Sequence, residues 1–387
     1  MIKRIASAKL KELASYYTAV AVIGPRQSGK TTLVRSLFPE KDYLTLENPD
    51  QRQYATDDPR GFLSQYPDGA VLDEIQNVPE LFSYLQQVID EDRRAGKFIL
   101  TGSNNFLLQE GISQSLAGRV GYLELLPLST TEMGNLASDN DNELMVKGFY
   151  PPIYDRGIPA DVWYNDYRRT YLERDVRQIK AITRFGEFER LLRLMAGRVA
   201  QELNYTALSV EVGVDVKTIQ EWTSVLEQGF IIYRMRPYHK NYNKTIVKRP
   251  KLYFYDTGLA CSLLGIKEAD QLTNHPTRGA IFENMVVGDA IKHFTHRGER
   301  PELYYWRDKT GREVDLIAER AGKLLPIEIK SGMTFQEDFS KHLKTFMKLS
   351  GVGNAWVLYG GREDYSFSTG IKAMNWRKIE DSLGSQS

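Results

Sequence analysis

Short apolar runs alternate with amphipathic stretches along the first third of the chain. Runs at 19–23, 42–46, 70–72, 98–101 and 122–125 have the length expected of strands. The segments between them repeat apolar residues at helical spacing, so strand and helix alternate to about residue 135. This order predicts a parallel sheet with helices on both faces.

The rest of the chain shows two further patterns. A polar stretch at 137–143 predicts a boundary loop, and helical periodicity follows at about 161–180 and 187–203. From about residue 279 the order is helix, two strands, helix and strand, which predicts a second α/β unit. We therefore expect three domains, at 1–136, 144–257 and 258–387.

The middle domain contains the pattern of a helix–turn–helix. Two helical stretches, at 206–212 and 215–220, are joined by Gly213. Apolar residues then recur at helical spacing and predict a buried stripe of Val216, Ile219, Trp222 and Leu226. Because 230–233 starts a predicted strand pair, the segment is typical of a winged helix.

The strongest chemical signal is the segment GPRQSGKTT at residues 24–32, which lies between the first apolar run and a helical pattern. It fits GxxxxGK[ST], whose backbone N–H groups and helix N-terminus hold phosphates. Lys30 is expected at the β- and γ-phosphates and Thr31 at Mg²⁺. The predicted nucleotide-binding residues are Gly24, Pro25, Arg26, Gln27, Ser28, Gly29, Lys30, Thr31 and Thr32. The predicted cofactors are ATP and Mg²⁺.

Polar residues that follow the third and fourth apolar runs predict catalytic roles. Asp73 is expected to hold the Mg²⁺ shell, and Glu74 to orient and deprotonate the attacking water. Ser103 and Asn104 are candidates to reach the γ-phosphate and this water, although an ordinary strand-end turn has the same composition. The pair at 73 and 74 predicts hydrolysis as well as binding.

These motifs, with SLAGRV at 115–120, resemble the AAA+ ATPases of a bacterial and archaeal family whose C-terminal half is a domain of unknown function. The resemblance implies ATP hydrolysis and assembly into a ring of identical subunits, with a hexamer expected. Arg119 is expected to complete a neighbour's site, and a local ion pair is the alternative. No second sensor arginine is evident; Arg174 is a candidate, and a helical surface residue is the alternative for it.

The strongest local charge bias lies at 230–255, which has seven Lys or Arg and no Asp or Glu. This bias predicts contact with DNA phosphates, with Tyr238 and Tyr242 available for stacking on bases. The alternatives are a spacer and a surface that contacts an acidic neighbouring subunit. Glu221, on the outer face of the second helix, opposes base-specific reading. The predicted DNA contacts are Lys217, Arg234, Arg236, Lys240, Lys244, Lys248 and Arg249.

A hairpin in the last domain carries a second group of acids. With the turn centred between Ala321 and Gly322, antiparallel partners have numbers that sum to 643, so Asp315 stands opposite Glu328. Lys330 lies on the same face of the hairpin. Two adjacent carboxylates repel each other unless a cation lies between them, which predicts a metal.

Glu283 lies on an apolar helical stripe and completes this group. Glu283, Asp315, Glu328 and Lys330 together resemble the restriction-endonuclease-like superfamily, especially its Holliday-junction-resolvase-like members. The resemblance implies a metal site at Glu283, Asp315 and Glu328, and a possible Mg²⁺-dependent nuclease. Alternating charges on a solvated strand face, in a domain kept only for binding, are the other interpretation.

Composition limits the remaining choices. The net charge of +1 indicates no general attraction to nucleic acid, and the lone Cys261 excludes disulfides and zinc clusters. No signal peptide and no apolar run of about 18 residues is evident, so we expect a cytoplasmic protein without membrane contact. His275, His293 and His296 show no ligand spacing and are expected at the surface. The 163–171 aromatic run is expected in the core.

The sequence thus predicts an α/β protein with a P-loop AAA+ domain, a winged-helix connector and a nuclease-like terminal domain. We expect ATP hydrolysis coupled to sequence-nonspecific binding or remodelling of DNA, with branched DNA among the candidates. A regulatory or signalling ATPase with an inactive protein-docking terminal domain is the main alternative. Site-specific transcription regulation is disfavoured by the acidic outer face of the second helix.

Overall fold

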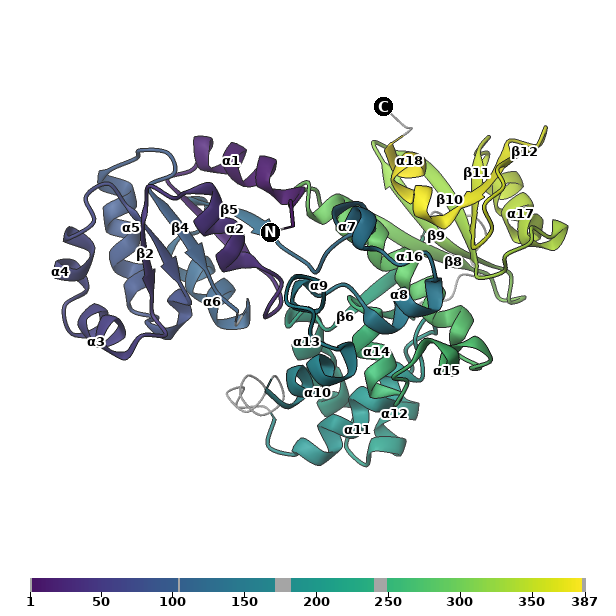
Figure 1. Ribbon diagram of the computed structural model, residues 1–387, viewed down its shortest axis with the longest axis horizontal. Helices are drawn as coiled ribbons and strands as arrows, with labels where there is room; N and C mark the ends of the chain where they lie inside the picture. Colours follow the sequence, from purple (N-terminus) through teal and green to yellow (C-terminus); the bar gives the residue numbers. More distant parts are fainter. Residues whose placement is uncertain (1, 104, 171–181, 240–248, 385–387) are drawn as a thin grey trace.

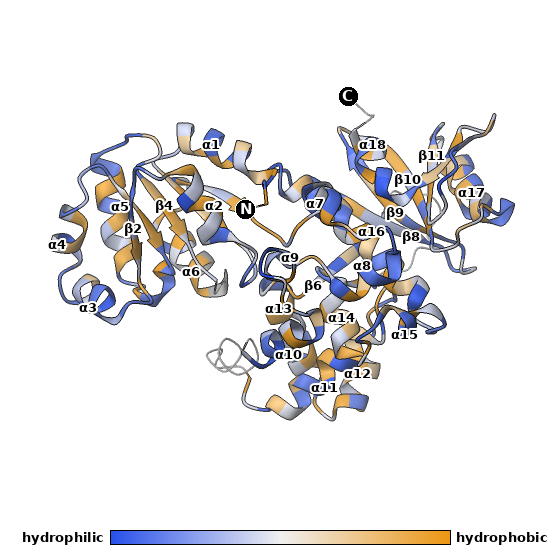
Figure 2. Ribbon diagram, viewed as in Figure 1, coloured by the Kyte–Doolittle hydropathy of each residue, from blue (hydrophilic) through white to orange (hydrophobic). Residues whose placement is uncertain are grey.

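The computed structural model describes residues 2–103, 105–170, 182–239 and 249–384. Two sheets organise these residues, one of five strands and one of eight, with a group of helices between them (Figure 1). The strands of both sheets are mainly apolar, and the outer helix faces carry the polar residues (Figure 2). Apolar side chains therefore set the layers, as the sequence pattern predicts.

The first sheet is wholly parallel, with strand order β2-β3-β4-β1-β5. Its strands are β1 (Ala19–Ile23), β2 (Asp42–Thr45), β3 (Ala70–Asp73), β4 (Phe98–Thr101) and β5 (Val120–Glu124). Its helices are α1 (Ala6–Tyr16), α2 (Lys30–Leu37), α3 (Pro49–Asp57), α4 (Pro59–Ser64), α5 (Leu81–Glu91) and α6 (Asn105–Ser115). All five predicted strands are present. Because β1 lies between β4 and β5, its carboxyl end opens at the point where parallel sheets bind ligands.

Helices make up the middle region. They are α7 (Thr130–Met133), α8 (Asp141–Lys147), α9 (Pro151–Asp155), α10 (Ala160–Thr170), α11 (Phe185–Ala196), α12 (Tyr205–Val212), α13 (Val216–Gln228), α14 (Thr257–Leu263) and α15 (Ala269–Thr273). The helices from α9 to α13 share a core of their own, whereas α7, α8 and α15 pack into the core that includes the two sheets. The predicted helix–turn–helix is α12 and α13, and Gly213 adopts φ +85° at the turn. Trp163, Tyr164 and Tyr167 are buried there, as expected.

The two strands after the helix–turn–helix do not form a separate wing. The strands β6 (Ile232–Pro237) and β7 (Lys251–Phe254) pair antiparallel, and β6 also pairs in parallel with β8 (Leu303–Arg307). The eight-stranded sheet therefore has the order β12-β13-β11-β10-β9-β8-β6-β7. Because this sheet runs across residue 257, the division into three domains stays a prediction.

The terminal region adds strands that the sequence pattern did not separate. It contains α16 (Arg278–Thr295), β9 (Glu313–Arg320), β10 (Lys323–Lys330), α17 (Lys341–Ser350), β11 (Ala355–Tyr359), β12 (Tyr365–Ser366), β13 (Ile371–Asn375) and α18 (Ile379–Gly384). The register between β9 and β10 is the predicted one, since Lys323 pairs with Arg320 and Ile327 with Leu316. Positive φ at Ala321 and Gly322 closes this hairpin tightly.

Buried charged groups join the first sheet to α16. Arg4 donates to the backbone oxygens of Ser28 (2.7 Å) and Leu126 (2.6 Å) and forms an ion pair with Glu132 at 3.0 Å. His296, which is fully buried, lies 3.3 Å from the Glu132 carboxylate. The expectation that His293 and His296 lie at the surface was wrong, because the last turn of α16 packs under the segment that leaves β5.

Burial lowers the pKa of His296 to about 4, despite the attraction of Glu132. The unfolded chain, with an ordinary pKa near 6.5, therefore binds more protons between these values. The contribution of His296 to stability should fall by about 2 kcal/mol as the pH falls from 7 to 5. The His296→Gln variant should lose this part of the pH dependence in urea unfolding. The exposed His239→Gln variant is the control, and an unchanged slope for His296→Gln would contradict the assignment.

Candidate functional site

The loop between β1 and α2 has the backbone of a phosphate cradle. Gly24 and Gly29 adopt φ +146° and +96°, which favour glycine. A Cβ at Gly24 would lie only 2.2 Å from the backbone oxygen of Leu125, so no other residue fits without movement. Gly29 then lies at the N-cap of α2, whose first N–H groups face the loop.

The two side chains at the start of α2 lie as the motif predicts. Lys30 is buried, and its ammonium donates to the backbone oxygens of Gly24 (2.9 Å) and Pro25 (2.8 Å). Thr31 Oγ1 donates to the Asp73 carboxylate at 3.1 Å. The lysine therefore lies inside the loop, and the threonine hydroxyl faces the acid at the end of β3.

The carboxylate of Asp73 accepts hydrogen bonds from three hydroxyl groups. Besides Thr31, the hydroxyls of Tyr43 and Thr101 also donate to its carboxylate. Burial, and then the hydrogen bond to Asp73, raise the pKa of Tyr43. These oxygen donors suit a hard cation such as Mg²⁺, which prefers carboxylate, hydroxyl and water ligands. Sequence reasoning missed Tyr43 and Thr101, although both lie on strands adjacent to β3.

Glu74 is held in an unusual backbone conformation. Its φ of +56° lies in the left-handed region, which is uncommon for a residue with a Cβ. Its carboxylate accepts hydrogen bonds from Ser103 Oγ at 2.7 Å and Gln76 Nε2 at 2.5 Å. Ser103 therefore contacts the predicted catalytic acid directly, while Asn104 lies outside the described residues.

A cavity of about 760 Å³ lies beside this loop, and the middle helices line its other side. Predicted nucleotide-site residues on its wall are Arg26, Gln27, Gly29, Lys30, Thr31, Thr32, Asp73, Glu74 and Ser103. The opposite wall comes from α9, α10 and their surroundings, namely Pro151, Pro152, Asp155, Arg156, Tyr167 and Thr170. The gap thus lies between two parts of the fold. Arg156 is a cationic wall residue that sequence reasoning missed, and Arg174 lies outside the described residues.

Arg119 does not line this cavity. Its guanidinium makes two hydrogen bonds to Asp90, at 2.6 and 3.0 Å. This is the local ion pair that the sequence left open as an alternative. The pair is partly exposed, so it contributes little to stability.

The structure separates the predicted DNA contacts into three groups. Lys217 lies 3.8 Å from Glu221, and Arg234 is paired with Glu227, so both charges are partly neutralised. Arg236 and Arg249 are exposed. Lys240, Lys244, Lys248 and Tyr242 lie outside the described residues.

Tyr238 was wrongly expected to offer a free ring for stacking. It is only 4% exposed, and its ring packs edge-on against Tyr304 and Phe346. The reason is the pairing of β6 with β8, which places this residue under the sheet.

The acids of the terminal region contact lysines. Lys330 Nζ lies 2.6 Å from Glu328 and 3.7 Å from Asp315. Lys251, which is 2% exposed, lies 2.8 Å from Glu283 and 2.5 Å from Glu313. Sequence reasoning counted Lys251 only as part of the basic run, because nothing in the pattern shows that β7 lies beside α16.

The pKa values of these acids and of Lys251 are shifted because the charged groups are buried close together. Burial raises the pKa of Glu283 to about 7, against the lowering effect of Lys251. Burial and then Asp315 raise the pKa of Glu328. The pKa of Lys251 is also raised, because Glu283 and its neighbours outweigh the cost of burial. The two lysines therefore compensate only part of the negative charge of the four acids in this group.

The metal site expected at Glu283, Asp315 and Glu328 stays a prediction. No group of three His, Cys, Asp or Glu residues suited to hold a metal ion occurs within 2–103, 105–170, 182–239 and 249–384. The paired register ends at Ile327 with Leu316, next to Asp315 and Glu328, and the ammonium group of Lys330 contacts both of these acids.

Comparison with known families divides the chain into three matches. Residues 16–134 match the family model of the AAA domain, which agrees with the geometry of the loop and of Asp73. Residues 139–270 and 278–379 match two domains of unknown function, DUF8612 and DUF4143. The N-terminal region is thus an AAA-type P-loop domain, and the protein is an ATPase.

Relatives share most of the chain. Rv2008c of Mycobacterium tuberculosis and Mb2031c of Mycobacterium bovis are each 29% identical over 377 residues, which cover 96% of this chain and 83% of theirs. A Haemophilus influenzae protein is 24% identical over 268 residues, covering 64% of this chain and 62% of its own.

Solved structures give weaker likenesses. The Walker-type ATPase PABY2304 of Pyrococcus abyssi has a TM-score of 0.48 at 15% identity and covers 68% of this chain and 96% of its own. A RuvB variant of Thermotoga maritima has a TM-score of 0.26 at 17% identity, and the likeness covers 60% of this chain and 86% of the RuvB chain. No helix among the described residues has the length and apolar character needed to cross a membrane.

Replacing Glu74 by Gln should separate binding from hydrolysis. The amide keeps the size of the side chain but cannot accept a proton, so turnover should fall by about 10²–10⁴-fold. Nucleotide affinity should stay within about twofold, because Lys30 and the loop are unchanged. Phosphate release and titration with a fluorescent ATP analogue measure the two effects. Glu80→Gln, an exposed change nearby, should alter neither.

Replacing Lys251 by Met should strongly destabilise the fold at neutral pH. The change leaves Glu283 and Glu313 facing each other without their shared cation, which costs about 3 kcal/mol. The loss should shrink at pH 5, where Glu283, with a pKa of about 7, is protonated. Urea unfolding at both pH values measures this. The exposed Lys323→Met change should cost little, and equal stability of both variants would refute the assigned role.

Proposed function

We propose that this ATPase uses Mg²⁺-dependent ATP hydrolysis to change its grip on DNA, without reading base sequence. The observation that supports this proposal is the position of the nucleotide cavity, between the phosphate loop and the middle helices. A nucleotide that contacts both the phosphate loop and the middle helices would change the distance between them when it binds or leaves. The middle helices are continuous with β6 and hence with the terminal sheet, so the change is carried to the basic region.

In this proposal each residue of the site has one task. Lys30 holds the β- and γ-phosphates, and Glu74 orients the attacking water and takes up its proton. Ser103 fixes the Glu74 carboxylate through its hydroxyl. Thr31 and Asp73 would hold Mg²⁺, which supplies positive charge to the phosphate oxygens. Arg156 adds a cation from the opposite wall.

Two contacts link the loop to the rest of the molecule. Trp163 Nε1 donates to Gln27 Oε1 at 2.8 Å, which ties the loop to α10. Arg4 donates to Ser28 and also pairs with Glu132, which lies beside His296 at the end of α16. A change in the loop on nucleotide binding or release therefore reaches both neighbouring regions.

The proposed DNA surface depends on the basic segment that follows α13. Arg236 and Arg249 are exposed and suit phosphate oxygens. Lys217 and Arg234 already face acids, so their part in the surface is smaller than the sequence suggested. Contacts of this kind bind the phosphate backbone of DNA and not its bases, so we expect binding without base specificity.

We further propose that identical subunits assemble into a ring, a hexamer by the family resemblance. Arg119 would leave Asp90 and enter the cavity of a neighbour, where its charge would stabilise the reacting phosphate. The exposure of the Arg119–Asp90 pair supports this exchange.

For the terminal domain, we favour a binding module over a nuclease. Lys251 contacts Glu283 and Glu313, so an ammonium group of the chain itself already compensates these two acids. A restriction-endonuclease-like fold is compatible with this interpretation, because such a domain can keep its shape after losing its metal. The alternative of a regulatory ATPase that docks another protein uses the same inactive domain.

The proposal predicts that DNA stimulates ATP turnover at low salt. Phosphate release is measured with single-stranded, duplex and four-way DNA over a range of protein concentrations, and Lys30→Ala is the inactive control. Stimulation that weakens with added salt and rises with protein concentration is expected.

Two outcomes would overturn the proposal. Turnover that no DNA alters would remove DNA as the partner and favour the regulatory alternative. Mg²⁺-dependent nicking of a plasmid, lost in Asp315→Ala but kept in Lys30→Ala, would show that the terminal domain is a nuclease.

A further inference from the structure

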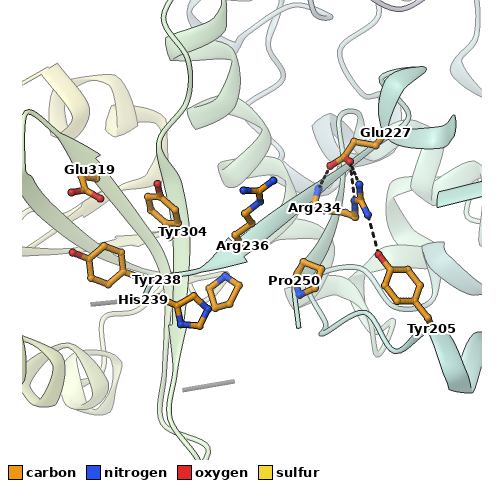
Figure 3. Close-up of a pocket in the computed structure, with 10 residues that line it drawn as sticks. Tyr205, Glu227, Arg234, Arg236, Tyr238, His239, Pro250, Tyr304 and Glu319 are labelled. Carbon is orange, nitrogen blue, oxygen red and sulfur yellow. Dashed lines mark hydrogen bonds and ion pairs between the residues drawn. The ribbon is translucent and has the colours of Figure 1, made fainter. Parts of the chain in front are cut away.

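A second cavity, of about 700 Å³, opens where β6 leaves the middle helices and joins the terminal sheet (Figure 3). Its size lies within the usual range of small-ligand sites. It shares no lining residue with the nucleotide cavity. The wall is made by Tyr205 of α12, Glu227 of α13, Arg234, Arg236 and Pro237 of β6, Tyr304 of β8, Glu319 of β9, and Tyr238, His239 and Pro250.

At one end of this cavity the charge of an arginine is compensated by a glutamate. Arg234 donates to Glu227 at 2.8 Å and to the hydroxyl of Tyr205 at 3.0 Å (Figure 3). Both side chains belong to the helix–turn–helix, so the contacts hold β6 against α12 and α13. This arginine is therefore a fixed part of the wall.

The middle of the cavity carries an arginine with a different environment. Arg236 lies two residues further along β6, so its side chain leaves the same face of the strand. It is exposed, and no hydrogen bond or ion pair engages it within the described part of the chain. Figure 3 shows its guanidinium between Arg234 and Tyr304. A planar guanidinium in this state suits a phosphate, which accepts two parallel hydrogen bonds.

Aromatic rings lie next to this arginine. Tyr304 is partly exposed, and Tyr238 packs edge-on against it with ring centres 5.6 Å apart. Tyr238 itself is fixed by Phe346. The partly exposed ring is thus rigidly supported. Glu319, the acid of this wall that is not paired with Arg234, lies beyond Tyr304 and away from Arg236 in Figure 3.

We propose that this cavity binds one nucleotide unit, with its phosphate on Arg236 and its base on the ring of Tyr304. A cation and a supported aromatic ring side by side are the two elements that bind a base and its phosphate. The unit comes from a single strand of DNA, and in this respect the inference rests on the proposed function. A free mononucleotide has the same chemistry and is the other source.

The proposal implies a preference for unpaired DNA. A base inside a duplex is stacked on both faces, so it must leave the stack before it can enter a cavity. A single strand has no such cost. The basic surface outside the cavity holds either form through phosphates, and only the cavity distinguishes them.

Binding of a fluorescein-labelled single strand of about 20 nucleotides and of a duplex of equal length tests this by anisotropy, with the full-length protein. Arg236→Ala and Tyr304→Leu should each weaken binding of the single strand by about 5- to 50-fold. Tyr304→Leu should leave duplex binding within about threefold, whereas Arg236→Ala also removes a phosphate contact of the DNA surface and should weaken duplex binding as well. Tyr304→Phe, which keeps the ring, should bind like the wild type. Arg52→Ala removes the same charge from an exposed position of α3 and is the matched control.

The outcomes separate this inference from the function on which it rests. Equal binding of the single strand by wild type, Arg236→Ala and Tyr304→Leu would overturn the cavity but leave DNA as partner. Binding of thymidine monophosphate that depends on Arg236, without binding of any DNA, would support the cavity and identify the free nucleotide as its source. Binding of neither, or competition by polyglutamate alone, would refute the cavity.

A second measurement does not depend on the folding of variants. A single strand that contains 5-iododeoxyuridine is irradiated on the wild-type protein, and the linked peptide is identified by mass spectrometry. The expected link lies on the peptide that contains Tyr304. Links confined to other peptides would contradict the proposal.

Discussion

The burial of Arg4 constrains the whole arrangement. Its guanidinium bonds to the phosphate loop at Ser28 and to Leu126 and Glu132 in the segment that follows β5, so one charge joins the N-terminal segment to two distant parts of the chain. A buried cation of this kind is stable only with all of its partners in place. The nucleotide loop therefore cannot shift independently of the segment that leads to the other regions. These contacts of Arg4 therefore help to keep the nucleotide cavity next to the middle helices.

Charge balance also determines the character of the terminal region. Four acids, Glu283, Glu313, Asp315 and Glu328, lie near one another, and Lys251 and Lys330 compensate them. A metal ion would provide the same compensation from outside the chain. The lysines offset part of this negative charge from within the chain, so internal ion pairs contribute to holding the terminal region together.

Sequence patterns predicted local features well and long-range ones poorly. The strands of the first sheet, the phosphate loop and the β9–β10 register depend on spacing within short segments, and all are present. The joining of β6 to β8 was missed because it depends on residues far apart in the chain, such as Arg236 and Tyr304. That one pairing buries Tyr238 and brings Lys251 near Glu313. The environments of His296 and Arg119 likewise depend on Glu132 and Asp90, which are distant in sequence, and the spacing of apolar residues cannot predict such contacts.

The parallel pairing of β6 with β8 also has a consequence for the history of this architecture. A helix–turn–helix whose wing is an inner strand of another sheet cannot be exchanged as a separate cassette. Cutting the gene at residue 257 would leave β6 with an open, unpaired edge, and such edges promote aggregation. The two regions of unknown function therefore share one sheet despite their two family descriptions, and replacing either region alone would break the pairing of β6 with β8.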